Sequence, residues 1–265
     1  MARGFFSCMG RGSSQERAAA MADAAAEENQ RGDAVLVELF SSQGCATSPE
    51  AEILVSRLGR GDFELGFPVI VLVYHVDYWD YTGWKDPFGS SSSTVRQKAY
   101  VEALRLDTLL TPQVIIQGRA HCVGTDQEAM LSAITSAPRF MAPTFQAAFQ
   151  RPSPDSLQVT LSSATKNKID EQEANVMVAL YENGLVTDCS NGENKGRVLA
   201  NDYVVRKLEN LCSAKEISAK KTMLGGVNFP LWEGFNSNKC GLVIFIENNA
   251  HQIICSQSLA LPENL

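Results

Sequence analysis

The sequence lacks the patterns that mark several large protein classes. It has no Asn-x-Ser/Thr glycosylation triplet, and no apolar run reaches the roughly 18 residues that a membrane-spanning helix needs. It also lacks the Gly-x-Gly-x-x-Gly, Walker, His-Glu-x-x-His and Gly-x-Ser-x-Gly motifs, so nucleotide-dependent and serine-hydrolase functions have no support. Basic residues number 23 against 30 acidic ones, and the net charge of -7 disfavours nucleic acid and anionic membrane as partners.

Cysteine is present, but in a pattern that argues against secretion. The seven cysteines are an odd number and are widely scattered, which fits a reducing compartment. Residues 1–33 have no continuous apolar core like that of a secretory signal, and their acidic residues disfavour an organelle transit peptide. We therefore expect a cytoplasmic or nuclear-cytoplasmic protein. Its residues 1–33 are expected to form a mobile tail.

The first half of the ordered sequence alternates between strand and helix patterns. Its predicted order is β-α-β-α-β-β-α, and the first three strands are almost continuously apolar. Strands of that kind are normally covered by helices on both faces. The predicted strands span 34–40, 68–76, 112–118 and 121–123, and the predicted helices begin at Thr47, at Ser93 and at a capping box over 125–128.

After Pro138 the pattern changes to strand-like alternation separated by Asn, Gly and Ser turns. Five to seven short strands in this half predict an antiparallel β-sandwich. The sequence therefore predicts an α/β domain over 34–138 followed by an all-β domain over 139–265.

The first candidate site is the segment 42–49, SQGCATSP, between the first strand and the first helix. A cysteine at this position, Cys45, lies near unpaired backbone N–H groups and the positive end of the helix dipole, which favour the nucleophilic thiolate. Ser48 occupies the place of the second cysteine in a Cys-x-x-Cys motif. The alternative is that Cys45 is only a small buried residue in a tight turn.

This arrangement, with Thr111-Pro112 just before the third strand, resembles the thioredoxin fold, whose members carry a cis proline opposite the cysteine. Longer strings resemble, more narrowly, the thioredoxin-like family catalogued as domain of unknown function 1223. These strings are LFSSQGC at 39–45, HVDYWDY at 75–81, GWKDPF at 83–88, TPQ at 111–113 and GENKGR at 192–197. The resemblance implies a thioredoxin-like domain in which Cys45, Ser48, Thr111 and Pro112 form the catalytic group. Family members commonly have a second cysteine where this chain has Ser48, so an ordinary dithiol mechanism would lack its resolving thiol.

The second candidate site is the loop from His75 to Phe88, which follows the carboxyl end of a buried strand. It is rich in aromatic and charged side chains, so we expect it to form a structural network between the domains, a substrate or thiol-activating pocket, or a metal site. His75 and Asp77 would be a base with its partner or two metal ligands, although no further ligand completes a zinc site. The candidate binding residues are His75, Asp77, Trp79, Trp84, Lys85 and Gln113.

The loop Gly192-Glu193-Asn194 is the expected lid of this region, with Glu193 meeting Lys85 or a backbone donor. An intimate two-domain unit, with Cys45 near the domain junction, is therefore predicted. Among the other cysteines, Cys122 and Cys189 are either core residues or distant resolving thiols. Cys212, Cys240 and Cys255 are expected to be core residues in strands.

Three functions remain open from the sequence. The first is a redox enzyme in which Cys45 alone attacks a thiol or disulfide substrate, a protein among the candidates, and an external thiol such as glutathione resolves the adduct. A glutaredoxin-like, iron–sulfur-binding role is a variant of it. The second is a non-catalytic binding or scaffold protein, and the third is a non-redox enzyme that uses Cys45 and the aromatic loop. No tightly bound cofactor and no metal ligand set is expected, and the oligomeric state is left open.

Overall fold

The computed structural model describes residues 34–140, 143–164, 173–217, 223–263 and 265; the tail predicted over 1–33 lies outside them. Buried apolar strands and amphipathic helices alternate in the first part of the chain, as their sequence periodicities predict. These elements are β1 (Val35–Ser41), α2 (Ser48–Gly59), β2 (Val69–His75), α3 (Ser91–Ala103), β3 (Gln113–Ile116), β4 (Ala120–Val123) and α4 (Gln127–Ser136).

The remaining elements are strands and short 3-10 turns, as the alternating pattern after Pro138 indicates. The strands are β5 (Thr144–Ser153), β6 (Ser156–Ala164), β7 (Ala174–Glu182), β8 (Leu185–Asp188), β9 (Val198–Asn201), β10 (Val204–Ser213), β11 (Met223–Pro230), β12 (Cys240–Asn248) and β13 (Ile253–Ala260).

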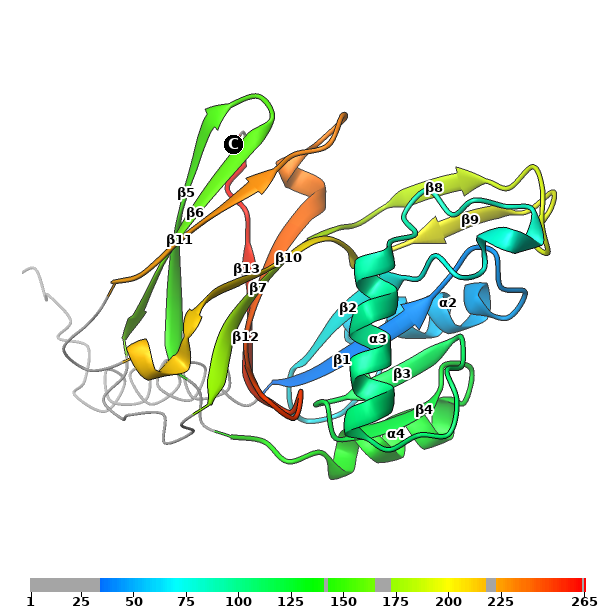
Figure 1. Cartoon of the computed structure of the whole chain (residues 1–265), viewed down its shortest axis with the longest axis horizontal. Helices are drawn as coiled ribbons and strands as arrows, with labels where there is room; N and C mark the ends of the chain where they lie inside the picture. Colours follow the sequence, from blue (N-terminus) through cyan, green and yellow to red (C-terminus); the bar gives the residue numbers. More distant parts are fainter. Residues whose placement is uncertain (1–33, 141–142, 165–172, 218–222, 264) are drawn as a thin grey trace, which may run out of the picture.

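One eight-stranded mixed sheet forms the framework, in the order β13-β12-β7-β10-β2-β1-β3-β4 (Figure 1). Four of its strands come from each half of the chain, and they meet where β10 pairs with β2. The predicted fold class, a thioredoxin-like α/β domain followed by a separate β-sandwich, is therefore wrong. The division near residue 138 falls between α4 and β5, and as a domain boundary it stays a prediction.

The physical reason for this error is the second covering layer of the central strands. Helices α2 and α4 cover one face, where Val37, Val73 and Ile134 belong to one apolar cluster. The other face packs against both α3 and strands of the C-terminal half, because Leu36 and Phe245 belong to a second cluster together with Tyr100 of α3 and residues of β7 and β13. An apolar strand indicates burial on both faces but does not specify whether a helix or another sheet provides it.

A buried ion network crosses the same interface. The Arg96 guanidinium, on α3, donates to Glu38 on β1 at 2.8 Å and to Glu247 on β12 at 2.8 Å. Tyr100 donates its hydroxyl to Glu38 as well. Burial alone would lower the pKa of Arg96, but the surrounding carboxylates and tyrosines outweigh it and hold that pKa well above its ordinary value. Paired charges therefore join both halves of the chain inside the core.

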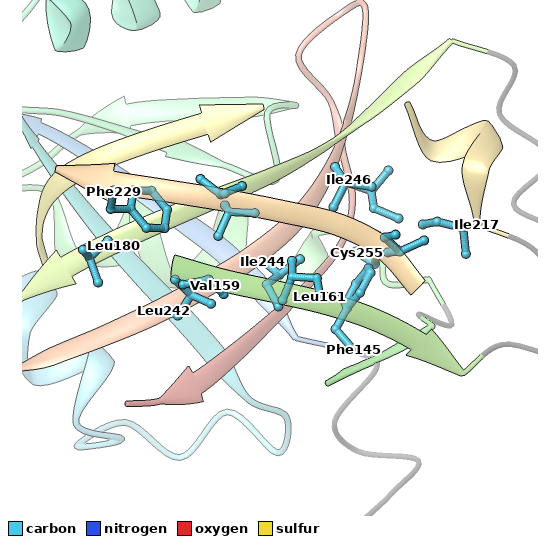
Figure 2. Packing of buried hydrophobic residues seen from close by; sticks show 14 of the residues in the cluster. Phe145, Val159, Leu161, Leu180, Ile217, Phe229, Leu242, Ile244, Ile246 and Cys255 are labelled. Carbon is cyan, nitrogen blue, oxygen red and sulfur yellow. The ribbon is translucent and has the colours of Figure 1, made fainter. Parts of the chain in front are cut away.

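A separate three-stranded sheet, in the order β11-β6-β5, covers the outer face of the C-terminal strands. Phe145, Leu161 and Phe229 from this sheet pack against Leu242 and Ile244 of β12 (Figure 2). The sandwich expected for the C-terminal half is thus present as a layer, but its inner sheet continues into the N-terminal strands.

Strands β8 and β9 form a two-stranded ribbon that leaves the C-terminal half and lies against α2 (Figure 1). The ribbon alternates between an inward face with Thr187, Leu199 and Asn201 and an exposed face with Val186 and Val198. The ribbon places polar residues near position 200 over the carboxyl end of β1. Cys45 lies just after this end in the sequence.

Helix starts agree with the sequence except in one detail. The start of α4 was expected at a capping box over 125–128, with Thr125 as the capping residue. Asp126 caps this helix instead, because its Oδ1 accepts the N–H of Ala129 at 2.9 Å.

Candidate functional site

Cys45 lies in a short turn between β1 and α2 that its serines hold closed. The N–H of Cys45 donates to the carbonyl of Ser42 at 3.1 Å, and the Ser42 hydroxyl accepts from Gly44 N–H at 3.1 Å. Ser48, at the first position of α2, accepts the N–H of Ser42 through Oγ at 3.2 Å. The residue that replaces a second cysteine therefore supports the turn that presents the first one.

The Cys45 sulfur faces the segment before β3. Its Sγ lies 3.5 Å from the carbonyl oxygen of Thr111 and 3.5 Å from Oγ1 of Thr47. The Thr111–Pro112 bond is cis, as the resemblance implied. Cys45 is only 3% exposed, whereas Ala46 and Thr47 beside it are open to solvent. A reactant would therefore approach the thiol over these two residues.

A chain of polar side chains fixes the Thr111 segment from the opposite side. Tyr78 shares a hydrogen bond with the Thr111 hydroxyl and donates to Gln97 Oε1 at 3.1 Å. The Gln97 amide donates to Leu110 O at 2.8 Å and to Gln113 Oε1 at 2.9 Å. Burial raises the pKa of Tyr78, so its hydroxyl remains protonated at neutral pH.

Gln43 is the centre of the contacts between the Cys45 turn and the β8–β9 ribbon. Its side-chain amide donates to Asn201 Oδ1 at 2.8 Å and to Thr187 Oγ1 at 3.0 Å. Its Oε1 accepts the indole N–H of Trp84 at 3.1 Å. The buried glutamine thus joins the turn, the aromatic loop and the ribbon.

The loop predicted as a lid does cover the cysteine turn. Asn194 donates through Nδ2 to the carbonyls of Gln43 and Cys45, at 2.8 and 2.9 Å, and Arg197 in turn donates to Asn194 Oδ1 at 2.8 Å. Gly192, at φ +74°, lies so close to Trp84 that a Cβ atom would come within 2.7 Å of the tryptophan Cβ. A glycine is therefore required there, and the intimate association predicted for the two halves is confirmed at this loop.

Behind the turn lies a fully buried group of ionisable side chains. His75, at the end of β2, shares a 2.7 Å hydrogen bond through Nδ1 with Asp86 Oδ2. Its Nε2 lies 3.6 Å from Glu52 Oε1 and makes no hydrogen bond in the described part of the chain. Asp86 Oδ2 also accepts the N–H of Gln43 at 2.7 Å, so this acid connects the histidine to the cysteine turn.

The electrostatics of this group favour a charged histidine. Burial lowers the pKa of His75, but the charges of Asp86 and Glu52 and the hydrogen bond that His75 donates to Asp86 outweigh burial and raise this pKa to about 9. Burial acts to raise the pKa of Asp86, yet His75 and the N–H donors bring it below the ordinary value. Burial dominates for Glu52, whose pKa is raised despite His75 and the Ser41 hydroxyl. An imidazolium–carboxylate pair is therefore buried here at neutral pH.

Several predicted site residues lie elsewhere than expected. Asp77 contacts Thr94, whose hydroxyl donates to it at 2.6 Å, and the partner of His75 is Asp86. Lys85 and Glu193 are both exposed, and the described contacts include no bond between them. Trp79 is half-buried against Gly44, and its indole nitrogen has no hydrogen-bond partner among the described residues.

Sequence reasoning missed Glu52 and Asn201. Asn201 donates to Glu52, which also accepts the hydroxyl of Ser41, so both belong to the buried group. Glu52 precedes Val55 by three residues, a spacing that places it on the buried face of α2. That spacing marks Glu52 as buried and can be read from the sequence. The position of Asn201, in contrast, depends on its hydrogen bond to Glu52, which lies 149 positions earlier.

The described cysteines form no disulfide with one another. Cys189 is completely buried beside Gln43, and burial followed by Asp86 and Asp188 raises its pKa. Burial and then Asp126 raise the pKa of Cys122 to about 11. Within the described ranges, no group of three His, Cys, Asp or Glu residues is arranged to hold a metal ion. No helix in those ranges combines the length and apolar character needed to cross a membrane.

Comparison with solved structures supports the fold. A protein from Agrobacterium tumefaciens, solved by X-ray crystallography, is 23% identical with a TM-score of 0.57, and the match covers 89% of this chain and 96% of that one. HBP35 of Porphyromonas gingivalis is 13% identical with a TM-score of 0.61, over 87% of this chain and 76% of that one. No curated protein matches the chain. A family model described as protein of unknown function (DUF1223) matches residues 36–247, and the chain therefore belongs to that family.

Proposed function

We propose that this chain is a single-cysteine thiol–disulfide exchange protein with Cys45 as its nucleophile. The observation that carries the proposal is the position of Cys45 in the turn directly before α2, with the solvent-exposed Ala46 and Thr47 beside it. The first N–H groups of a helix have no carbonyl partner within it, and they favour an anion at that end. A thiolate at this place is the reactive form of cysteine.

The proposed reaction has two exchange steps. The Cys45 thiolate attacks one sulfur of a disulfide, forms a mixed disulfide and releases the other sulfur as a thiolate. A second thiolate, from glutathione or a similar small thiol, then attacks the sulfur held by Cys45 and regenerates the Cys45 thiolate. Ser48 offers no thiol for this second step, so the resolving thiol comes from outside the turn. A reducing compartment such as the cytoplasm supplies it.

The buried ion pair has a positioning role in this proposal. Asp86 holds the N–H of Gln43, and Asn194 holds the carbonyls of Gln43 and Cys45. Backbone N–H and carbonyl groups of the cysteine turn are therefore both held by side chains from other parts of the chain. These hydrogen bonds keep Sγ oriented, but Asp86 and Asn194 take no part in the exchange of sulfur–sulfur bonds.

A second candidate is a binding protein without catalysis, and the burial of Cys45 favours it. A thiol that is 3% exposed behaves like a small core residue unless the turn opens. In this alternative the polar network around Gln43 serves only to attach the β8–β9 ribbon.

Reduction of a glutathionylated peptide in the presence of glutathione separates the two candidates. We expect Cys45→Ser to abolish turnover and Cys122→Ser, at a half-buried thiol on β4, to keep it. We also expect Ser48→Cys to gain reduction of insulin disulfides by a dithiol route, because it restores a local resolving thiol. No turnover in the natural protein would support the binding candidate instead, and turnover that survives Cys45→Ser would show that Cys45 is not the nucleophile.

A further inference from the structure

The central sheet divides at the junction of β2 and β10. These two strands pair only at Val204 and Val73, with Val73 N–H donating to the carbonyl of Tyr203 at 2.8 Å. From this point β10 continues beside β7. The amino-terminal part of β2, Val69 to Leu72, therefore has β1 on one side and no paired strand on the other within the described residues.

The open edge of β2 carries backbone groups that can form hydrogen bonds. On the β1 side, Pro68 accepts the N–H of Val35 at 3.0 Å, and Val76 donates to Ser41 at 2.9 Å. Since successive residues of a strand alternate between its two neighbours, the N–H and C=O groups of Val69 and Val71 point away from β1. They face the place where the sheet divides.

A cavity of about 850 Å³ occupies this place. Its lining combines the divided edge of β2 with residues of β7, β12 and β13, so both halves of the chain contribute. The lining includes Ala34, Val69, Val71, Tyr181, Tyr203 and Ala260.

Two tyrosines, Tyr181 and Tyr203, line the cavity. The rings of Tyr181 and Tyr203 lie 5.7 Å apart at 43°. Each is held against a glycine: a Cβ on Gly241 would lie 2.2 Å from the Tyr181 hydroxyl oxygen, and one on Gly59 would lie 2.6 Å from the Tyr203 ring. Burial raises the pKa of both phenols, so they remain uncharged at neutral pH.

The lining offers polar and apolar surface in about equal share, and its polar groups are uncharged. None of the lining residues carries a charge. Asn183 accepts the N–H of Tyr203 through Oδ1 at 2.8 Å, which leaves its amide nitrogen as a donor beside the cavity. A charged ligand would lose its hydration here without meeting a counter-charge, whereas an aromatic ring would find matching surfaces.

We propose that this cavity is a binding site for an uncharged aromatic small molecule, held between the tyrosine rings and the open edge of β2. Its volume falls within the range of roughly 300–1,000 Å³ that small-molecule sites have, and it lies where a sheet divides. The site is separate from Cys45, because Ala34 and Val69 mark the amino ends of β1 and β2 whereas Cys45 follows the carboxyl end of β1. It stands independently of the thiol-exchange proposal.

Titration with N-phenyl-1-naphthylamine, an uncharged aromatic probe whose fluorescence rises in apolar surroundings, tests the proposal on the full chain. We expect saturable binding to one site. Ala260→Trp places a large side chain in the lining and should raise the Kd at least about tenfold, which corresponds to about 1.4 kcal/mol. Ala200→Trp is the matched control, because Ala200 is also an exposed strand alanine but lies on the β8–β9 ribbon; its Kd should stay within about twofold of the natural value.

Two further measurements keep the test independent of the variants. The anionic relative 1-anilinonaphthalene-8-sulfonate should bind at least about tenfold more weakly, because the lining offers no cation. In the natural protein, methyl NMR signals of Val69 and Val71 should shift as the uncharged probe is added. Absence of saturable binding, equal binding to Ala260→Trp, equal or tighter binding of the anionic probe, or methyl shifts confined to other regions would each overturn the proposal.

Discussion

His75 is completely buried between two acidic side chains, and this setting determines when it gains or loses its proton. His75 meets two carboxylates, and its raised pKa of about 9 means that the folded protein keeps its proton across the neutral range. In the unfolded chain a histidine loses that proton near its ordinary value of about 6.5. The folded state therefore holds more protons than the unfolded state between these two values.

This difference predicts how stability depends on pH. The contribution of His75 is fully present below about pH 6.5 and is lost as the pH rises toward about 9. Urea unfolding at several pH values should show the free energy of unfolding falling across this window in the natural protein, and falling less steeply in His75→Gln. His121→Gln is the control, since His121 is exposed on β4. Equal slopes for the natural protein and His75→Gln would contradict the buried imidazolium.

At the scale of elements, the loop between β8 and β9 is attached to the cysteine turn mainly through Asn194. This single side chain satisfies two buried carbonyls, and an acceptor left without a donor costs about 1–3 kcal/mol. The loop therefore contributes to the shape of the turn even though it lies about 150 positions away in the sequence.

Asn194→Ala tests this attachment. We expect a loss of about 1–3 kcal/mol in the free energy of unfolding and faster amide hydrogen exchange for residues 43–47. Asn191→Ala in the same loop should change neither, because Asn191 is exposed and donates only to its neighbour Ser190. Unchanged exchange at 43–47 in Asn194→Ala would show that the loop does not hold the turn.

Single elements were more predictable from the sequence than their assembly. The strand at 34–40 and the helix after Thr47 follow from local periodicity, and β1 and α2 lie where these patterns place them. The loop over Cys45 was also predicted, from glycine and asparagine in a polar segment. The neighbour of β2 was not predictable, because a single pair between Val73 and Val204 decides it and no local pattern marks such a pair.

The same limit applies within the candidate site. Cys45 and His75 stand out by residue type and by position after a strand. Glu52 and Asn201 acquire their importance only from partners far along the chain, and Asp77 was paired with His75 because alternate residues of a strand share a face. The loop after β2 breaks that alternation and brings Asp86 to the histidine instead.

For the whole molecule, the shared sheet predicts that the halves depend on each other. A fragment of residues 34–143 would keep α2 and α4 over one face of the central strands, but on the other face Leu36, Leu72 and Tyr74 would keep only α3 and lose the cover of the C-terminal strands. We expect this fragment to aggregate or to lack a cooperative thermal transition, measured by circular dichroism and light scattering. A soluble fragment that unfolds cooperatively would argue for independent domains.

The ion network of Arg96 has a consequence for synthesis on the ribosome. Arg96 and Glu247 are 151 positions apart, so the guanidinium meets its second carboxylate only after that many further residues have been made. At roughly 5–20 residues per second, the amino-terminal strands wait about 8–30 seconds in the nascent chain without the C-terminal strands that complete the cover of their second face. Chaperones that shield apolar surface have their greatest opportunity in this interval. β1 and β2 obtain the sheet part of their second layer only after β12 and β13 have been made.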